Sequence, residues 1–398
     1  MKILFLTLVY SKSGNTIYRD LMNELVKQGN EVSVVTALER KEKKDTYIEI
    51  EDNGIKVLRV KTLNIQKTNI FEKGISTLLI ENIFIKQIKK YYNKEKFDLI
   101  IYSTPPITFE KVIKFIKNRD SAKSYLLLKD IFPQNAVDMN IFSKNSIFYK
   151  FFRRKERKLY SISDYIGCMS QKNADYLLKN NINLNKKQVE ICPNSINPSY
   201  REYDKKTNLR EAYGITNRQL LVIYGGNLGR PQGIDFLLDI LKSNNENKNI
   251  KFIIIGSGTE AEKLKLFIKN NKIKNVILKS KLPKEQYDEL VKTADIGLIL
   301  LDKRFTIPNF PSRLLGYMDA GIPILAATDV NTDVGEVIVK NNFGYWCESG
   351  DLNKFNEILN ECISNKEKLK EQGKNGRVYL ENNYTAKHSA DIIMKHFN

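Results

Sequence analysis

The stretch that decides the fold runs from residue 220 to residue 241 and reads LLVIYGGNLGRPQGIDFLLDIL. Its apolar start, Leu220–Tyr224, is typical of a buried strand in a parallel sheet. Glycines crowd the next segment, Gly225–Gly233, and the apolar residues of Ile234–Leu241 recur at helical spacing. A strand, a glycine-rich turn and a helix in this order predict the first part of a βαβ unit.

The same order of elements recurs before and after this stretch. Phe252–Ile255 leads through Gly256-Ser257-Gly258 into a helical pattern, and at the chain start Met1–Tyr10 leads through the turn Ser13–Asn15 into another. Met1–Tyr10 could also be read as a signal peptide, but no small-residue cleavage site follows it. Alternating strands and helices predict an α/β protein with two Rossmann-like, doubly wound domains facing a cleft. A Pro-, Asn- and charge-rich stretch at 193–206 marks the linker, so we expect domains at 1–200 and 207–384.

Composition excludes several classes of protein. No window of 18 residues lacks a charge, so we expect no transmembrane helix. Four Cys without a CxxC pair indicate reduced thiols rather than a disulfide framework. The two His, His388 and His396, lie near the C-terminal end of the sequence, which argues against a His-based zinc site or a Ser-His-Asp triad. D-x-D does not occur, so a metal held by such a pair is not expected, and neither is a cofactor.

The net charge of +19 is unevenly distributed. Residues 1–200 carry +14 and residues 201–398 carry +5, which suggests an anionic partner of the first half. The segment FYKFFRRKERKLY at 148–160 would form a basic amphipathic helix of the kind that lies on anionic membranes. The membrane or acceptor contacts expected there are Lys150, Arg153, Arg154 and Arg157. An aromatic core face with a solvated basic face is an equally good interpretation. No RNA-binding signature accompanies the segment, and no nucleic-acid partner is expected.

Two glycine segments and one arginine indicate a phosphate site in the second half. Backbone N–H groups and a helix N-terminus at Gly225–Gly233 would favour an anion. Gly256–Ala261 matches a dinucleotide motif, but the next strand ends in Lys279-Ser280 where that motif needs an acid. Arg313, after Ser312 at the start of a predicted helix, is unfavourable there unless an anion binds. The alternative interpretations are an ordinary turn after a strand for Gly225–Gly233 and a solvated side chain for Arg313.

In the first half, Lys129 and Asp130 directly follow a predicted strand. Ligands in open α/β sheets lie beyond the carboxyl ends of strands. Asp130 could therefore orient or deprotonate a hydroxyl group, or it could cap the turn that follows.

The ordered set of motifs resembles the family 4 retaining glycosyltransferases of the GT-B fold, over nearly the whole chain. The resemblance rests on motifs such as LKDIFPQNAVD at 128–138, PNSIN at 193–197, GGNLGRPQG at 225–233, FPSRLLGYMDAGIPIL at 310–325 and TDVGEVI at 332–338. It is nearest to bacterial surface-polysaccharide enzymes, in particular the UDP-N-acetyl-L-fucosamine transferases. It implies that a final helix at 385–397 packs back on the first domain.

The resemblance also has departures. Two Glu that most of the wider family carries align with Pro308 and Gly316, and the usual Arg and Lys of the glycine loop align with Asn227 and Gln232. Arg313 stands where the nearest subgroup has Lys. A catalytic His of the first domain is absent, and Asp130 or Lys129 falls near its position.

The resemblance implies transfer of a hexose or N-acetylamino sugar from a nucleotide diphosphate sugar, with UDP expected, and with retention of configuration. The acceptor would be a polyprenyl-diphosphate-linked glycan of O-antigen or capsule synthesis, handled at the cytoplasmic face of the cell membrane. Asp130, Lys129 and Arg313 would be catalytic. The expected donor-binding residues are Gly14, Gly226, Asn227, Arg230, Gln232, Gly256, Gly258, Leu282, Ser312, Arg313 and Asp333. An inactive membrane- or nucleic-acid-binding scaffold and a nucleotide-sugar epimerase remain alternatives.

Overall fold

The computed structural model describes residues 1–12, 14, 16–64, 70–199 and 209–397. The chain forms two compact units: unit 1 comprises Met1–Asn197 with Ala386–Asn398, and unit 2 comprises Pro198–Thr385. The turn residues Ser13 and Asn15, and the expected domain boundary at 200–207, lie outside the described residues. Each unit is built on its own largely parallel sheet with helices on both faces, which confirms the predicted pair of Rossmann-like domains.

The sheet of unit 1 has the strand order β3-β4-β2-β1-β5-β6-β7-β8. Only β3 runs antiparallel to its neighbour. The sequence did not predict β3, because its charged surroundings hide a short half-buried edge strand. The strands are β1 (Lys2–Thr7), β2 (Glu31–Glu39), β3 (Tyr47–Ile50), β4 (Lys56–Thr62), β5 (Leu99–Ser103), β6 (Lys123–Leu128), β7 (Tyr165–Cys168) and β8 (Val189–Ile191).

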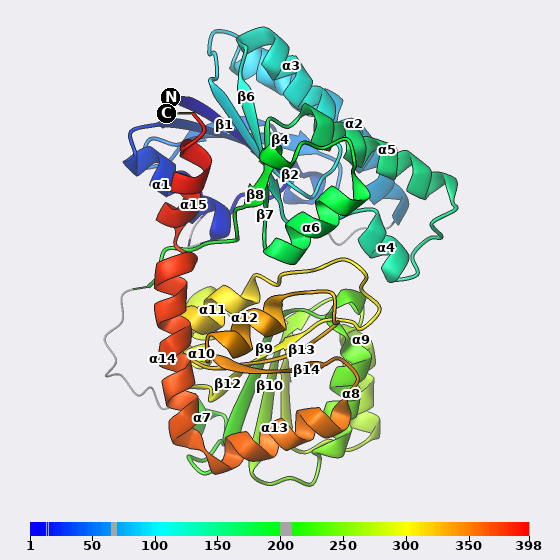
Figure 1. The fold of residues 1–398 in the computed structure, drawn as a ribbon, viewed down its shortest axis with the longest axis vertical. Coiled ribbons are helices and arrows are strands. Elements are labelled where there is room, and N and C mark those ends of the chain that lie inside the picture. Colours follow the sequence, from blue (N-terminus) through cyan, green and yellow to red (C-terminus); the bar gives the residue numbers. More distant parts are fainter. Residues whose placement is uncertain (13, 15, 65–69, 200–208, 398) are drawn as a thin grey trace. The chain divides into compact units, whose positions relative to one another are not determined.

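Helices cover both faces of this sheet. The buried apolar side chains of α1 and α15 pack together on one face, where Leu21, Leu25 and Ile393 join a single core cluster. Figure 1 shows these two helices side by side, so the end of the chain forms part of unit 1. The helices are α1 (Ile17–Lys27), α2 (Ile70–Tyr91), α3 (Glu110–Asp120), α4 (Gln134–Asp138), α5 (Ile147–Ile162), α6 (Gln171–Asn180) and α15 (Ala386–Met394), with 3-10 turns η1 (Arg40–Glu42) and η2 (Lys186–Gln188).

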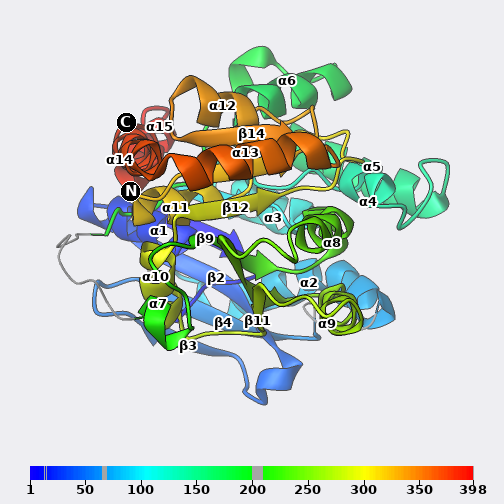
Figure 2. The same cartoon turned by 90° about the horizontal axis from the view of Figure 1, so that it is seen from below.

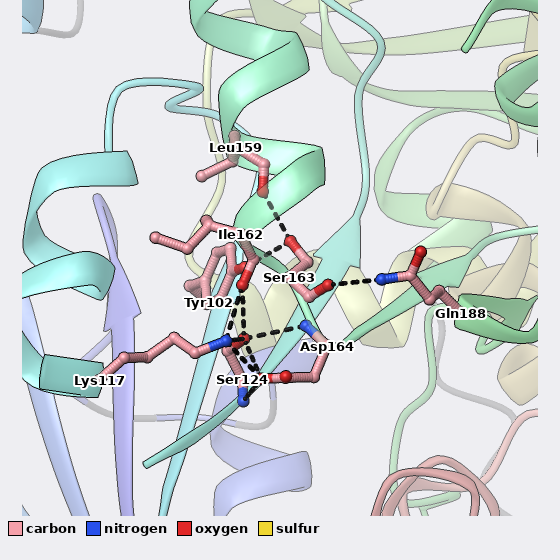
Figure 3. A network of polar contacts seen from close by, with 8 residues as sticks. All are labelled: Tyr102, Lys117, Ser124, Leu159, Ile162, Ser163, Asp164 and Gln188. Atoms are coloured by element: carbon pink, nitrogen blue, oxygen red, sulfur yellow. Dashed lines mark hydrogen bonds and ion pairs between the residues drawn. The ribbon is translucent and has the colours of Figure 1, made fainter. Parts of the chain in front are cut away.

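A polar network fixes the C-terminal end of α5 on the sheet (Figure 3). Asp164 accepts hydrogen bonds from Lys117 Nζ at 2.7 Å and from the Ser124 N–H at 2.8 Å. The hydroxyl groups of Ser163 and Tyr102 lie 2.6 Å apart and share a hydrogen bond. Because these groups satisfy one another, α3 and α5 are held in a defined position.

Unit 2 contains a fully parallel sheet of order β11-β10-β9-β12-β13-β14. Figure 2 shows α8 and α9 on one side of this sheet and α10 and α11 on the other. The strands are β9 (Leu220–Asn227), β10 (Ile250–Ser257), β11 (Val276–Lys279), β12 (Ile296–Leu300), β13 (Ile324–Thr328) and β14 (Gly344–Glu348). The helices are α7 (Leu209–Ala212), η3 (Arg230–Gln232), α8 (Ile234–Ser243), α9 (Ala261–Asn270), α10 (Lys284–Thr293), α11 (Arg313–Ala320), α12 (Val334–Lys340), α13 (Leu352–Ser364) and α14 (Lys366–Asn383).

Two strands of unit 2 extend further than the sequence predicted. β9 continues past Tyr224 to Asn227, and β10 continues past Ile255 to Ser257. The ladder keeps its register through the glycines, with Gly226 opposite Gly256. Because the glycines lack side chains, β9 and β10 can stay paired where a turn was expected.

Within the described residues, no helix combines the length and the apolar character that crossing a bilayer requires.

Candidate functional site

The candidate site lies at the carboxyl edge of the unit 2 sheet. Because all six strands are parallel, the loops that follow β9, β10, β12 and β13 gather at one edge. This is the edge at which open α/β sheets bind ligands. The loop after β9 is tied to the loop after β12 by a hydrogen bond from the Asp302 N–H to the Pro231 carbonyl, at 3.1 Å.

The glycine loops after β9 and β10 pack main chain against main chain. Gly226 has φ +131°, a conformation that side-chain-bearing residues rarely adopt. A Cβ on Gly256 would lie 2.0 Å from the Gly226 carbonyl oxygen, and one on Gly258 would lie 2.3 Å from that of Leu228. Leu228 is held at both ends, since its N–H donates to Ser257 at 3.0 Å and its carbonyl accepts from Glu260 at 2.9 Å. The glycines are therefore needed for the shape of this edge.

Arg313 is the first residue of α11 and reaches the same edge. Its Nη2 donates to Gln232 Oε1 at 2.6 Å, and its guanidinium carbon lies 4.3 Å from the ring centroid of Tyr224. A Cβ on Gly226 would come within 3.3 Å of Nη2, so the glycine also makes room for this side chain. The second amino group, Nη1, is buried and has no hydrogen-bond partner.

Tyr317, one helical turn after Arg313, anchors α11 to the sheet. Its hydroxyl group lies 3.2 Å from the carbonyl oxygens of Ile223 and Leu298 and accepts from the Gly225 N–H at 3.3 Å. Burial raises the pKa of this phenol well above its ordinary value, so it remains neutral. Residues four apart share a face of a helix, and Tyr317 therefore fixes the position of the helical turn that carries Arg313.

The charge of Arg313 has no carboxylate partner within the described part of the chain. Among the residues that the structure describes, none of the recorded ion pairs involves this guanidinium, and its direct neighbours Gln232 and Tyr224 are uncharged. A buried charge without a counter-ion is unfavourable by several kcal/mol, on the order of 3–5 kcal/mol in proteins. The arrangement therefore favours an anion beside Nη1.

The other predicted donor-binding residues differ in accessibility. Arg230 has a side chain that is 59% exposed and lies 3.5 Å from Glu260, so it is partly neutralised. Asn227 ends β9, and Ser312 is exposed and makes no side-chain hydrogen bond to the first turn of α11. Leu282 is half-buried after β11, and Asp333 is buried at the start of α12.

Asp329, directly after β13, belongs to this edge but was not predicted. It is 1% exposed, and its Oδ1 accepts the N–H groups of Asn331 at 2.9 Å and Thr332 at 3.2 Å. Its Oδ2 is buried and has no hydrogen-bond partner. Burial raises the pKa of this carboxyl group to about 6. An aspartate that follows a strand and precedes a turn in TDVNTD is the signal that could have identified it.

In unit 1 the structure places Lys129 and Asp130 directly after β6. The amide of Asn135 donates to both carboxylate oxygens of Asp130, at 2.8 and 2.9 Å, and Lys129 Nζ lies 3.4 Å from the Cys192 carbonyl. Burial lowers the pKa of the Lys129 amine from its ordinary value. Gly14 has φ +77°, as a turn requires, although its neighbours Ser13 and Asn15 are outside the described residues.

The basic residues of α5 do not all face outward. Arg153, expected at a membrane or acceptor, bonds to Glu156 at 2.5 Å and to the Asn180 carbonyl at 2.6 Å, and its side chain is only 15% exposed. The expectation for Arg153 does not fit this placement, because the residue lies on the inner face of the helix. Lys150, Arg154 and Arg157 are exposed.

The exposed face of α5 also carries large apolar side chains. Ile147 is 83% exposed, Phe148 is 68% exposed and Phe151 is 41% exposed. We call Ile147, Phe148, Lys150, Phe151 and Arg154 the α5 patch.

The described residues contain no group of three or more His, Cys, Asp or Glu side chains arranged to hold a metal ion.

Comparison with known proteins relates these features to a family. Residues 205–379 match the family model described as glycosyl transferases group 1. A protein named "Probable glycosyltransferase WbjE" from Pseudomonas aeruginosa is 23% identical over 299 residues, which cover 74% of this chain and 73% of that protein.

Solved structures show the same fold over the full length. The sucrose-phosphate synthase of Thermosynechococcus elongatus superposes with a TM-score of 0.79 at 15% identity, covering 100% of this chain and 98% of that one. Alr3699/HepE of Anabaena, solved in complex with UDP-glucose, superposes with a TM-score of 0.73 at 15% identity, covering 100% and 99%. The chain therefore has the two-domain GT-B fold, and its residues 205–379 match the model of the glycosyl transferases group 1 family.

Proposed function

We propose that the protein is a glycosyltransferase that takes a hexose or an N-acetylamino sugar from a nucleotide diphosphate sugar, with UDP as the nucleotide. The acceptor would be a polyprenyl-diphosphate-linked glycan of surface-polysaccharide synthesis, and the anomeric configuration would be retained. The relative named WbjE and the UDP-glucose complex of the Anabaena protein support the general reaction and the donor class.

The observation that carries the proposal is the uncompensated guanidinium of Arg313. Its Nη1 is buried without a partner, at the sheet edge that the closely packed glycine loops form. A diphosphate leaving group gains negative charge as the glycosidic bond breaks. A preorganised cation in a site of low polarity stabilises such charge most in the transition state. Arg230 would contribute more weakly, because it is exposed and close to Glu260.

The donor class is tested by isothermal titration calorimetry with UDP, GDP and their sugar conjugates, followed by a nucleotide-release assay. We expect UDP to bind and Arg313→Ala to weaken binding about 100-fold, as expected for loss of a charge-assisted contact. The matched control is Arg218→Ala, an exposed arginine before β9, which should leave binding unchanged. If the wild-type protein binds no nucleotide and releases none from any donor, the scaffold alternative is correct.

Retention is tested once a donor is known. Proton NMR of the first product formed, before mutarotation, reports the anomeric configuration. An inverted product would contradict this part of the proposal without affecting the donor assignment.

The α5 patch supports contact with an anionic membrane. Three large apolar side chains of α5 stand in solvent together with Lys150 and Arg154, whereas Glu156 of the same helix is buried. An interfacial helix inserts such apolar groups while its basic groups contact anionic headgroups. Contact of this kind would bring unit 1 to a lipid-linked acceptor at the inner face of the cell membrane.

Membrane contact is tested by sedimentation with vesicles containing phosphatidylglycerol. We expect Phe148→Ser with Phe151→Ser to release most of the bound protein. The matched control is Leu266→Ser, a 49%-exposed apolar residue on α9 of unit 2, which should have no effect. Equal binding of the α5 variant and the wild-type protein would show that the patch does not contact the membrane.

A further inference from the structure

The uncharged neighbour of Arg313 determines how this cation is presented. Gln232 Oε1 accepts the hydrogen bond from Arg313 Nη2 at 2.6 Å. A guanidinium group can only donate, so the amide must turn its oxygen towards Arg313 and its NH2 group away. The two side chains together therefore present only donors: Nη1 of Arg313 and Nε2 of Gln232.

The main chain under Gln232 is fixed. Its N–H donates to the Gly229 carbonyl at 3.0 Å, and the preceding Pro231 carbonyl accepts from the loop after β12 at 3.1 Å. Gly233 follows with φ +57°, and a Cβ there would lie 3.0 Å from the Leu301 carbonyl oxygen. The main chain thus holds the Cα of Gln232 in place, and the hydrogen bond to Arg313 Nη2 fixes the end of its half-buried side chain.

Tyr224 makes a second contact with the guanidinium of Arg313. Its ring lies 4.3 Å from the guanidinium carbon of Arg313, and its hydroxyl group donates to the Asn227 carbonyl at 2.7 Å. Stacking on this ring and one hydrogen bond to Gln232 fix the guanidinium plane, so Nη1 keeps one direction.

We infer that Gln232 is a positioning residue whose role is to orient Arg313 towards the diphosphate of the donor. The inference rests on the proposed function, and it adds a restriction: a neutral acceptor at position 232 is required. A carboxylate there would pair with Arg313 and remove the charge that the diphosphate needs. If Gln232 had only a structural role, a carboxylate at this position would be favourable, because it would neutralise the buried charge of Arg313.

The decisive variant is Gln232→Glu, measured for both stability and UDP binding. We expect its unfolding temperature to equal or exceed that of the wild-type protein, while UDP affinity falls at least 100-fold. Gln232→Ala should lower UDP affinity about tenfold, the effect of one charge-assisted hydrogen bond, and should lower UMP affinity less. Gln286→Glu, an exposed change on α10, is the matched control and should alter neither quantity.

A double-mutant cycle separates positioning from direct contact. If Gln232 acts through Arg313, adding Gln232→Ala to Arg313→Ala should weaken UDP binding less than twofold further. Additive losses in the cycle, or a Gln232→Glu protein that binds UDP like the wild type, would overturn the inference alone. A wild-type protein that binds neither UDP, GDP nor pyrophosphate would overturn the proposed function together with it.

Discussion

Replacing Asp329 by Asn should stabilise unit 2 at alkaline pH and lose this effect in acid. The carboxyl group is 1% exposed, and burial raises its pKa from 3.8 to about 6. An Asn side chain keeps an oxygen for the N–H groups of Asn331 and Thr332 and removes the buried charge. The loop after β13 should therefore keep its conformation.

The magnitude follows from linkage. Each pKa unit corresponds to 1.36 kcal/mol, so a shift of about two units costs the folded protein about 3 kcal/mol at pH 8. The folded pKa lies above the unfolded one, so the folded state holds the proton more tightly. The free-energy cost of the buried Asp329 carboxylate is therefore absent below about pH 4, grows as the pH rises from about 4 to about 6, and is complete above about pH 6. The amide that replaces Oδ2 is left unpaired and costs about 1–2 kcal/mol, so a net gain of about 1–2 kcal/mol remains at pH 8.

The assay is urea unfolding followed by the fluorescence of Trp346, the single tryptophan of the chain. Its indole N–H donates to Thr328 Oγ1 at 2.9 Å, next to Asp329, so the signal reports on this part of unit 2. We expect a higher midpoint for Asp329→Asn at pH 8 and none of that gain at pH 4.5. Asp239→Asn, an exposed change on α8, is the control. A gain of equal size at both pH values would contradict the reasoning, because it would not come from titration of this carboxyl group.

Two further outcomes follow from packing. Gly256→Ala should destabilise unit 2 by about 1–3 kcal/mol and weaken UDP binding, because its Cβ would lie 2.0 Å from the Gly226 carbonyl oxygen. Gly316→Ala, whose Cβ would have no neighbour within 4 Å, should stabilise unit 2 by about 0.5–1 kcal/mol. Urea unfolding measures both changes, and equal effects of the two variants would be inconsistent with the close approach at Gly256. The four Cys are buried, and burial raises the pKa of the Cys362 thiol to about 12. A thiol reagent should therefore react slowly with the folded protein and should label all four thiols after denaturation. A fast reaction of the folded protein would contradict this burial.

The glycine loops show how far sequence reasoning reaches at this site. A strand followed by glycines and a helical stripe predicts where the loop lies, and the structure has it there. The pattern did not predict that β9 and β10 stay paired through Gly226 and Gly256. A glycine in the sequence is compatible both with a turn and with the close approach of two strands. Which of the two occurs depends on the neighbouring strand, which the local sequence does not identify.

Arg153 shows a different limit. In the sequence, Arg153 is one of several cations of a basic helix. In the structure it forms an ion pair with Glu156, three residues later in the same helix. Glu156 is the only acid between Phe148 and Tyr160 and is followed by Leu159, so helical spacing alone could have placed Arg153 on the inner face. Asp329 and α12 were missed because a short helix after a buried strand leaves no long periodic pattern.

The two binding surfaces proposed for this chain should respond differently to salt. Arg313 is partly buried and its Nη1 is shielded from solvent, whereas Lys150 and Arg154 stand exposed on α5. Salt screens exposed charges over about 10 Å at 0.1 M and about 3 Å at 1 M, but it screens buried pairs much less. Raising NaCl from 0.05 to 0.5 M should therefore remove most vesicle binding while changing UDP affinity only a few-fold. If UDP affinity fell in parallel with vesicle binding, exposed lysines rather than the Arg313 guanidinium would be holding the diphosphate.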